Sequence, residues 1–207
     1  ASLIKKMTPF YSLSEKIGCM ISQMVDSPIK SVEVVCYGEA TDSKSITLLL
    51  MKGLLSNVTD NRINMVNADI VAKERGLSFS HSYSSLDTPF LNLIKCTVYT
   101  DEKEIDISGS IYFENHLRIV NIMGFDIDLN PEGPMLFIKN KDVPGVIGKI
   151  GTILGDCNVN IAGYLLSRIE KSDFAYAVIK VDELINDKVL EEIYSIKDII
   201  EIKQIDL

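Results

Sequence analysis

The sequence lacks the features that mark membrane, secreted and nucleic-acid-binding proteins. No apolar run reaches the roughly 18 residues of a membrane-spanning helix, and the first residues, ASLIKKMTPF, lack the apolar core of a secretion signal. Basic residues are in deficit: 21 Lys and Arg stand against 29 Asp and Glu, for a net charge of −8, and they are scattered. We therefore expect a cytoplasmic protein that binds neither membrane nor nucleic acid.

Clustered cysteine and histidine are also missing. The histidines are only two, His81 and His116, and no C-x-x-C pair occurs. The four cysteines, far apart in the chain, are Cys19, Cys36, Cys96 and Cys157. This spacing predicts no metal site and no disulfide framework, and favours buried, reduced thiols.

What the chain does have is enough apolar material for a core in one large or two small domains. It is 207 residues long and 46% hydrophobic. Helix and strand breakers concentrate in the stretch NPEGP, residues 130–134, which we predict to be a linker. The expected division is a first domain over residues 1–130 and a second over residues 134–207.

The first domain has the patterns of an α+β fold. A helix is predicted after Thr8 as cap, with Pro9 in its first turn and one apolar stripe. The stripe consists of Phe10, Leu13, Ile17, Met20, Ile21 and Met24. A strand over 31–38 precedes helices over 45–56, with a tolerated Gly53, and 67–75, with Asn67 as a cap and Gly76 as a stop. From Leu77 the period changes to two, which predicts consecutive strands joined by short turns as far as Leu129.

The second domain has a compact βαββαβ pattern. Strands are predicted over 135–139, 159–168, 174–181 and 199–205, and helices over 144–157 and 187–194. This order is that of the ferredoxin-like fold, in which two helices cover one face of a four-stranded antiparallel sheet. The other face is left for another partner.

A glycine-rich stretch, residues 138–155, raises the question whether it binds or packs. Its glycines are Gly145, Gly148, Gly151 and Gly155. Their spacing matches neither phosphate-loop nor dinucleotide motifs. Because residues three apart lie on one side of a helix, the later glycines favour close packing against another backbone.

The turn before this helix suits a zwitterion. With Pro144 at the first helical position, free backbone N–H groups would face outward and could hold a carboxylate. Asp142, two residues earlier, could hold an ammonium group. The alternative is that Asp142 only caps the helix or shapes the turn.

These residues resemble a known regulatory module. The segment 140–161, NKDVPGVIGKIGTILGDCNVNI, resembles the opening of an ACT domain, which in serine-regulated members runs D-x-P-G-x-[IV]-G followed by V-N-I. Upstream, residues 66–76, 108–112 and 118–129 resemble the intervening, allosteric-substrate-binding domain of long-form D-3-phosphoglycerate dehydrogenases.

The resemblance implies a regulatory region without a catalytic centre. The Rossmann domain of these enzymes and its catalytic Arg, Glu and His have no counterpart here, so no cofactor is expected in this segment. NAD would bind to the catalytic domain of the parent enzyme, which would oxidise 3-phosphoglycerate in L-serine biosynthesis.

The resemblance also implies a site for L-serine or another small amino acid. ACT domains of the family pair edge to edge into an eight-stranded sheet, which predicts a homo-oligomer with the effector at the seam. Asp142 would take the ammonium group, with Asn140 beside it, and Asn160 of the other subunit would bind the carboxylate or the side chain. Backbone amides near Val146 and Ile147 would complete the site. The family usually has His or Tyr at the position of Asn140, which is a departure.

A second, weaker site is implied at Arg118, which matches a basic position that holds an anion in the family. Phe125 and Asn130 stand where related sequences carry arginine, and Arg118 is equally consistent with an exposed solubilising residue.

Two other functions remain open from the sequence. One is an ACT scaffold that assembles subunits without a ligand. The other is a subunit related to serine dehydratases, which requires a four-iron cluster that the cysteine spacing argues against.

Overall fold

The computed structural model describes residues 2–56, 63–168 and 172–207, and the chain forms two compact units. Unit 1 consists of Ala1–Gly124 and Asp128–Pro131, and unit 2 of Phe125–Ile127 and Glu132–Leu207.

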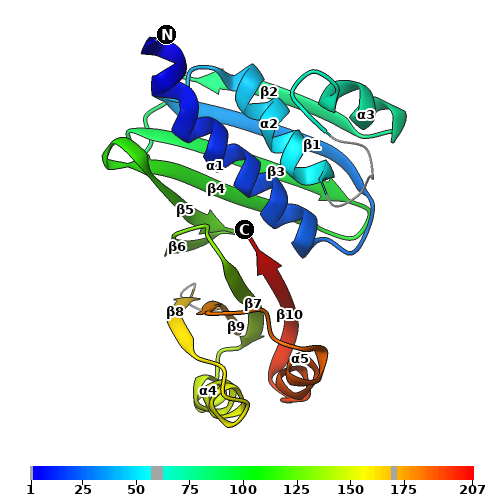
Figure 1. The fold of residues 1–207 in the computed structure, drawn as a ribbon, viewed down its shortest axis with the longest axis vertical. Coiled ribbons are helices and arrows are strands. Elements are labelled where there is room, and N and C mark those ends of the chain that lie inside the picture. The colour runs from blue at the N-terminus through cyan, green and yellow to red at the C-terminus, as the bar shows by residue number, and fades with distance from the viewer. Residues whose placement is uncertain (1, 57–62, 169–171) are drawn as a thin grey trace. The chain divides into compact units, whose positions relative to one another are not determined.

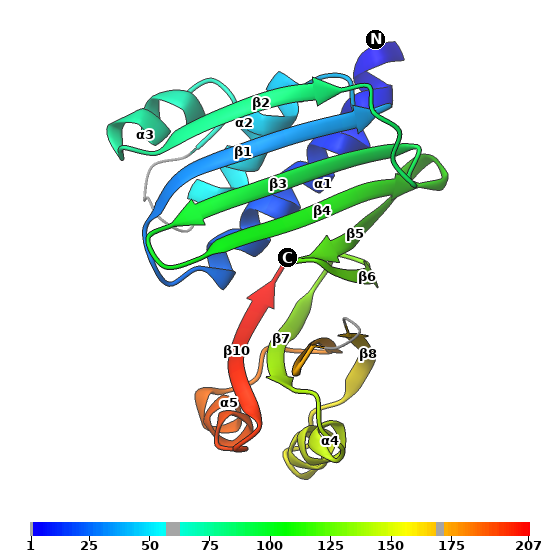
Figure 2. The same cartoon turned by 180° about the vertical axis from the view of Figure 1, so that it is seen from behind.

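Unit 1 is built on a six-stranded sheet in the order β2-β1-β3-β4-β5-β6. Its helices are α1 (Ser2–Met24), α2 (Ser43–Leu55) and α3 (Ala68–Glu74), with a short 3₁₀ turn, η1 (Phe113–Asn115). The strands of its sheet are β1 (Ile29–Gly38), β2 (Ser78–Ser84), β3 (Asn92–Thr100), β4 (Glu104–Tyr112), β5 (His116–Ile122) and β6 (Phe125–Leu129), and residues 125–127 of β6 are assigned to unit 2. The helices lie on one face of the sheet (Figure 1), and the strands are seen from the other face in Figure 2.

The sequence predicted β2 as the first of several strands joined by short turns, and this is wrong for β2. It lies at the sheet edge and pairs in parallel with β1, and residues 85–91 lead from it to β3. Strands β3, β4 and β5 pair antiparallel in chain order.

Helix α1 has the predicted apolar stripe but not the predicted start. All six predicted positions are buried. The helix begins at Ser2, however, and Pro9 lies inside it. Met7, one turn before Phe10, is also buried. Packing of this earlier turn offsets the hydrogen bond that a proline cannot donate.

Helices α1 and α2 cross at two glycines. A Cβ at Gly18 would lie 2.0 Å from the Leu50 carbonyl oxygen, and a Cβ at Gly53 would lie 2.1 Å from that of Glu15. Such distances leave no room for any side chain. Gly53 is therefore required by the crossing, whereas the sequence suggested that it is merely tolerated.

Helix α3 ends at Glu74, one residue before the predicted end, and it begins without the predicted cap. Gly76, at φ +70°, follows it in the left-handed region that favours glycine. Asn67 precedes the helix without a side-chain cap bond. Its Oδ1 instead accepts from the Asn64 amide at 2.8 Å.

The segment from Ser108 to Tyr112, part of the family resemblance, joins β3 to β4 through a buried polar cluster. Ser110 Oγ donates to the Asn92 backbone oxygen at 2.8 Å, and Asn92 Oδ1 accepts from the Ile111 amide at 2.7 Å. Asn92 Nδ2 returns a bond to the Ile111 oxygen at 3.1 Å. The cluster satisfies its buried polar atoms, as burial requires.

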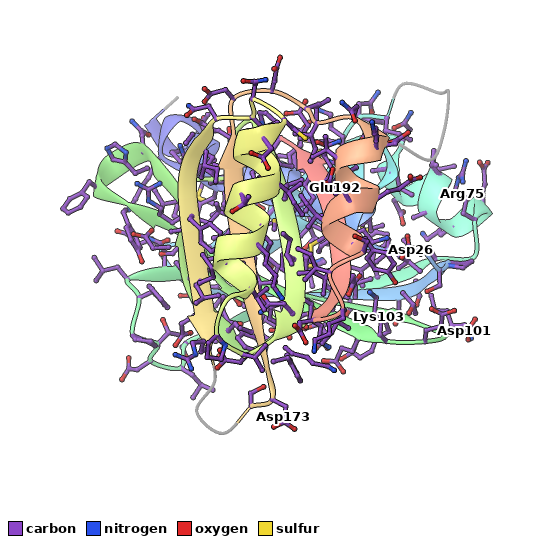
Figure 3. All side chains as sticks on the ribbon, turned by 90° about the horizontal axis from the view of Figure 1, so that it is seen from below. Asp26, Arg75, Asp101, Lys103, Asp173 and Glu192 are labelled. Carbon is purple, nitrogen blue, oxygen red and sulfur yellow. The ribbon has the colours of Figure 1, made fainter. Side chains whose placement is uncertain are left out.

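Unit 2 has the predicted βαββαβ order and antiparallel sheet. Its elements are β7 (Pro134–Lys141), α4 (Val146–Asp156), β8 (Ile161–Arg168), β9 (Phe174–Val181), α5 (Asp187–Tyr194) and β10 (Ile199–Asp206). The strand order is β10-β7-β9-β8, and all three pairings are antiparallel. Helices α4 and α5 lie side by side on one face (Figure 3), and the core between helices and sheet includes Ile138, Ile150 and Ile193. The predicted α+β fold class is confirmed.

The opposite face of this sheet was predicted to await a partner, but aromatic rings of the same unit pack there. Phe137 stacks on Tyr176 at 5.1 Å between ring centroids, and Phe125 meets Tyr176 edge-on at 4.3 Å. Lys139 Nζ lies 4.1 Å from the centroid of the Phe174 ring.

Candidate effector-binding site

The loop after β7 is held in place by its own backbone. The Lys141 amide donates to the Asp198 oxygen at 2.8 Å, and the Asp142 amide donates to the Asp173 oxygen at 3.0 Å. Asn140 is buried, and its Nδ2 donates to the Lys141 oxygen at 2.7 Å. The side-chain amide of Asn140 thus helps to fix the loop. Asp142, which follows the strand, is partly exposed.

Helix α4 begins two residues later than predicted. Gly145 occupies the N-cap position at φ +92°, outside the helical region, so Pro144 lies in the preceding turn and not in the helix. The first bond of the helix runs from the Lys149 amide to the Gly145 oxygen at 3.1 Å, and no side chain caps it. The amides of Val146 and Ile147 therefore have no intrahelical acceptor, which is the property the sequence predicted for this turn.

The carboxylate of Asp142 pairs with a residue that the sequence did not single out. Arg168 Nε donates to Asp142 Oδ2 at 2.6 Å. Asp142 follows β7 and Arg168 ends β8, and both strands flank β9 at its first residues, Phe174 and Ala175. Only this strand order brings the two charges together, so sequence spacing gave no signal for the pair.

Asn160 lies at the other end of β8. Its Nδ2 donates to Asp182 Oδ2 at 2.7 Å, next to the end of β9. At about 3.3 Å per residue, the length of β8 separates Asn160 from Arg168 by roughly 25 Å. Within one chain, therefore, the structure does not bring Asn160 to Asp142.

The outer side of helix α4 is open. Apart from the adjoining backbone of α4 itself, a Cβ at Gly148, Gly151 or Gly155 would meet no atom within 4 Å in the described parts of the chain. No other backbone of the described chain packs against these glycines, so their predicted close packing against another backbone stays a prediction that concerns a second molecule. Val146 points into the core, whereas Ile147 is 46% exposed.

The outer strand β8 adds apolar surface beside α4. Leu166 is 39% exposed, and the hydroxyl oxygen of Tyr164 is buried without a hydrogen-bond partner in the described residues. Burial raises the pKa of Tyr164.

The predicted anion site in unit 1 contains a carboxylate. Arg118 Nε lies 3.2 Å from Asp128 Oδ1. Phe125, where related sequences carry arginine, is buried in the aromatic cluster described above, and Asn130 is partly buried. Arg118 as an anion-binding residue stays a prediction.

The cysteines are less uniform than predicted. All four are free thiols, and Cys36 and Cys96 are buried. Burial raises the pKa of Cys36 to about 12. Burial also raises the pKa of Cys96. Cys19 is half-buried, and Cys157, at the end of α4, is exposed, so the prediction of a buried thiol is wrong there. Among the residues with described positions, no group of three or more His, Cys, Asp or Glu is placed to hold a metal ion, and no helix is long and apolar enough to cross a membrane.

The fold defines a class: an α+β unit followed by a ferredoxin-like unit with an open outer strand and helix. Residues 6–123 match the D-3-phosphoglycerate dehydrogenase intervening domain, and residues 134–198 match the ACT domain. The first match covers more than half of the chain, which therefore belongs to the D-3-phosphoglycerate dehydrogenase intervening-domain family and carries an ACT domain after it. The resemblance inferred from the sequence is confirmed.

Curated relatives agree over nearly the whole chain. It is 36% identical over 204 residues to the D-3-phosphoglycerate dehydrogenase of Bacillus subtilis, which covers 98% of this chain and 39% of that protein. The protein of the same name from Methanocaldococcus jannaschii is 33% identical, over 98% of this chain and 38% of that protein. The chain thus spans about two fifths of the length of these relatives.

Proposed function

We propose that this chain is the regulatory region of a serine-biosynthesis dehydrogenase, and that it binds L-serine or another small amino acid where two ACT domains meet. The parent enzyme would oxidise 3-phosphoglycerate with NAD in a catalytic domain outside this segment. Membership in the family and the name of the relatives support the proposal.

One observation carries the location of the site: Arg168, which pairs with Asp142, and Asn160 lie at opposite ends of β8, an outer strand. In a two-fold symmetric dimer, a contact between two different residues occurs twice, once in each direction between the copies. Antiparallel pairing of two β8 strands about Tyr164 would place Asn160 of one copy beside Arg168, and hence beside Asp142, of the other. Two equivalent sites result, each incomplete in a single chain.

The surface around β8 suits such pairing. The open glycines of α4 leave room for a second backbone, and Ile147 and Leu166 present apolar area beside them. In the pair, Asp142 would accept the ammonium group, and Asn160 would bond the carboxylate or the side chain. The amides of Val146 and Ile147 lie next to this position in the chain.

Binding across the seam links the effector to assembly. A ligand at about 100 times its Kd stabilises the form that binds it by roughly 2.7 kcal/mol. Coupling of about 1 to 3 kcal/mol is the usual scale of allosteric regulation. An effector that bridges two subunits can therefore control a catalytic domain through association.

The test combines calorimetry with sedimentation velocity on the 207-residue protein. L-serine should release or absorb heat and shift the protein toward the dimer. Asp142→Ala should abolish the heat, while Asp69→Ala, which removes an exposed carboxylate paired with Lys73 at 2.9 Å, should not.

Two outcomes would contradict the proposal. Unchanged heat in Asp142→Ala rejects the site. A stable dimer that gives no heat with any of the standard amino acids favours the scaffold without a ligand.

A further inference from the structure

The proposed ammonium acceptor already holds a cation of its own chain. Arg168 Nε and Asp142 Oδ2 lie 2.6 Å apart, with the two side chains 63% and 25% exposed. The pair lies at the end of β8 where the antiparallel dimer would bring Asn160 of the second copy. An effector that reaches Asp142 therefore meets Arg168 as well.

The pair is not needed to hold the loop. Backbone bonds to Asp173 and Asp198 and the buried amide of Asn140 already fix residues 140–142. Exposed ion pairs contribute little to stability. Fastening the loop therefore does not account for Arg168 at this position.

Both charges keep unused bonding capacity. Arginine has five N–H donors in a planar fork, and the described contacts of Arg168 use only Nε. Its two Nη groups match the geometry of a carboxylate, which arginine binds in bidentate fashion. In the described residues, Asp142 Oδ1 likewise takes part in no bond, so it can accept from an ammonium group while Oδ2 stays with Arg168.

We propose that Arg168 binds the carboxylate of a free α-amino acid whose ammonium group binds Asp142. This inference rests on the proposed function and deepens it, because it gives both charges of the ligand to one chain. Asn160 of the second copy then contacts the ligand side chain and not the carboxylate. The site selects zwitterions, because a ligand with only one charge leaves half of the Asp142–Arg168 pair unused.

The experiment measures how strongly each variant prefers a free carboxylate. The standard amino acids are first screened by calorimetry against the 207-residue protein, and the tightest is compared with its methyl ester, which keeps the ammonium group and loses the carboxylate charge. The wild type should prefer the free acid by roughly 10-fold to 100-fold, the range expected for a bond between charged groups.

Arg168→Gln should remove this preference and lower the affinity for the free acid by the same factor. Arg168→Lys, which keeps the charge without the fork, should fall between the two. Lys73→Gln, which breaks an exposed ion pair on α3, is the matched control and should behave as wild type. Thermal unfolding of each variant verifies that it is folded.

Two outcomes would contradict the role proposed for Arg168 or the proposed function. If Arg168→Gln binds the free acid as tightly as wild type or tighter, Arg168 is only a competitor for Asp142, and the inference fails while the proposed function stands. If the wild type binds none of the amino acids, the proposed function itself fails.

Discussion

The glycines where α1 crosses α2 and the glycines of α4 differ in what a methyl group would meet. At Gly18 and Gly53, a Cβ would lie 2.0 to 2.1 Å from a carbonyl oxygen of the facing helix. At Gly148 and Gly151, it would meet open space. Gly18 and Gly53 are needed for the contact between two helices of the folded chain, whereas Gly148 and Gly151 remain on the surface.

The difference teaches that spacing alone does not identify a packing glycine. The three-residue spacing of the glycines in α4 predicted close packing, but the close helix contact within this chain is made by Gly18 and Gly53. These two glycines lie 35 positions apart and form no pattern in the sequence. A small-residue surface that folding leaves open is available for another molecule. The comparison therefore separates glycines that stabilise the protomer from glycines that can serve association.

The largest expected effect is at the crossing. Gly53→Ala forces α1 and α2 apart, because the new Cβ would overlap the Glu15 oxygen, and we expect a loss of about 3 kcal/mol or more in the free energy of unfolding. Denaturant titration measures it. A loss below about 1 kcal/mol would show that the helices can separate freely and would remove the contrast with α4.

Much of the fold could be predicted from the sequence, because periodicity and caps agree there. Strand 174–181 and helix 187–194 have the bounds predicted for them. Both helix starts that were assigned from a proline are wrong. Helix α1 begins before Pro9, where Met7 is buried. Helix α4 begins after Pro144, because Gly145 has a left-handed backbone conformation.

The candidate site was only partly accessible to such reasoning. The position of Asp142 before a helix with free amides follows from local sequence. The contact with Arg168 depends on β9 lying between β7 and β8, which is a property of the sheet order. Local patterns could not supply it, although the predicted ferredoxin-like order contained the needed information.

A smaller effect is expected at the start of α2, which is capped where α4 is not. Asp42 accepts from the Ser45 amide at 3.2 Å and from the Tyr11 hydroxyl at 2.7 Å. Asp42→Ala should lower the free energy of unfolding by about 1 to 2 kcal/mol, whereas Asp42→Asn, which can still cap, should lose less. Equal losses in the two variants would mean that the cap bond contributes nothing.

Gly151→Ala should act in the opposite direction and more weakly. With no atom near the new methyl group, the higher helix propensity of alanine should stabilise the protomer by about 0.5 to 1 kcal/mol. Thermal unfolding at low protein concentration measures this gain. If the open face serves association as proposed, sedimentation at high concentration should show a weaker dimer in the same variant, and an unchanged dimer would place the seam elsewhere.

The smallest effect is the pH dependence of the Asp42 contribution. Burial alone would raise the pKa of Asp42, but hydrogen bonds from Tyr11 and Ser45, with nearby His81, bring it below its ordinary value of 3.8. A carboxyl whose pKa is lower in the folded state stabilises the protein above its unfolded pKa and loses that contribution as pH falls through the folded value. The difference in unfolding free energy between wild type and Asp42→Asn should therefore be constant near neutral pH and shrink below about pH 4. A difference that stays constant down to pH 2 would show that the charge of Asp42, as distinct from its capping oxygen, does not stabilise α2.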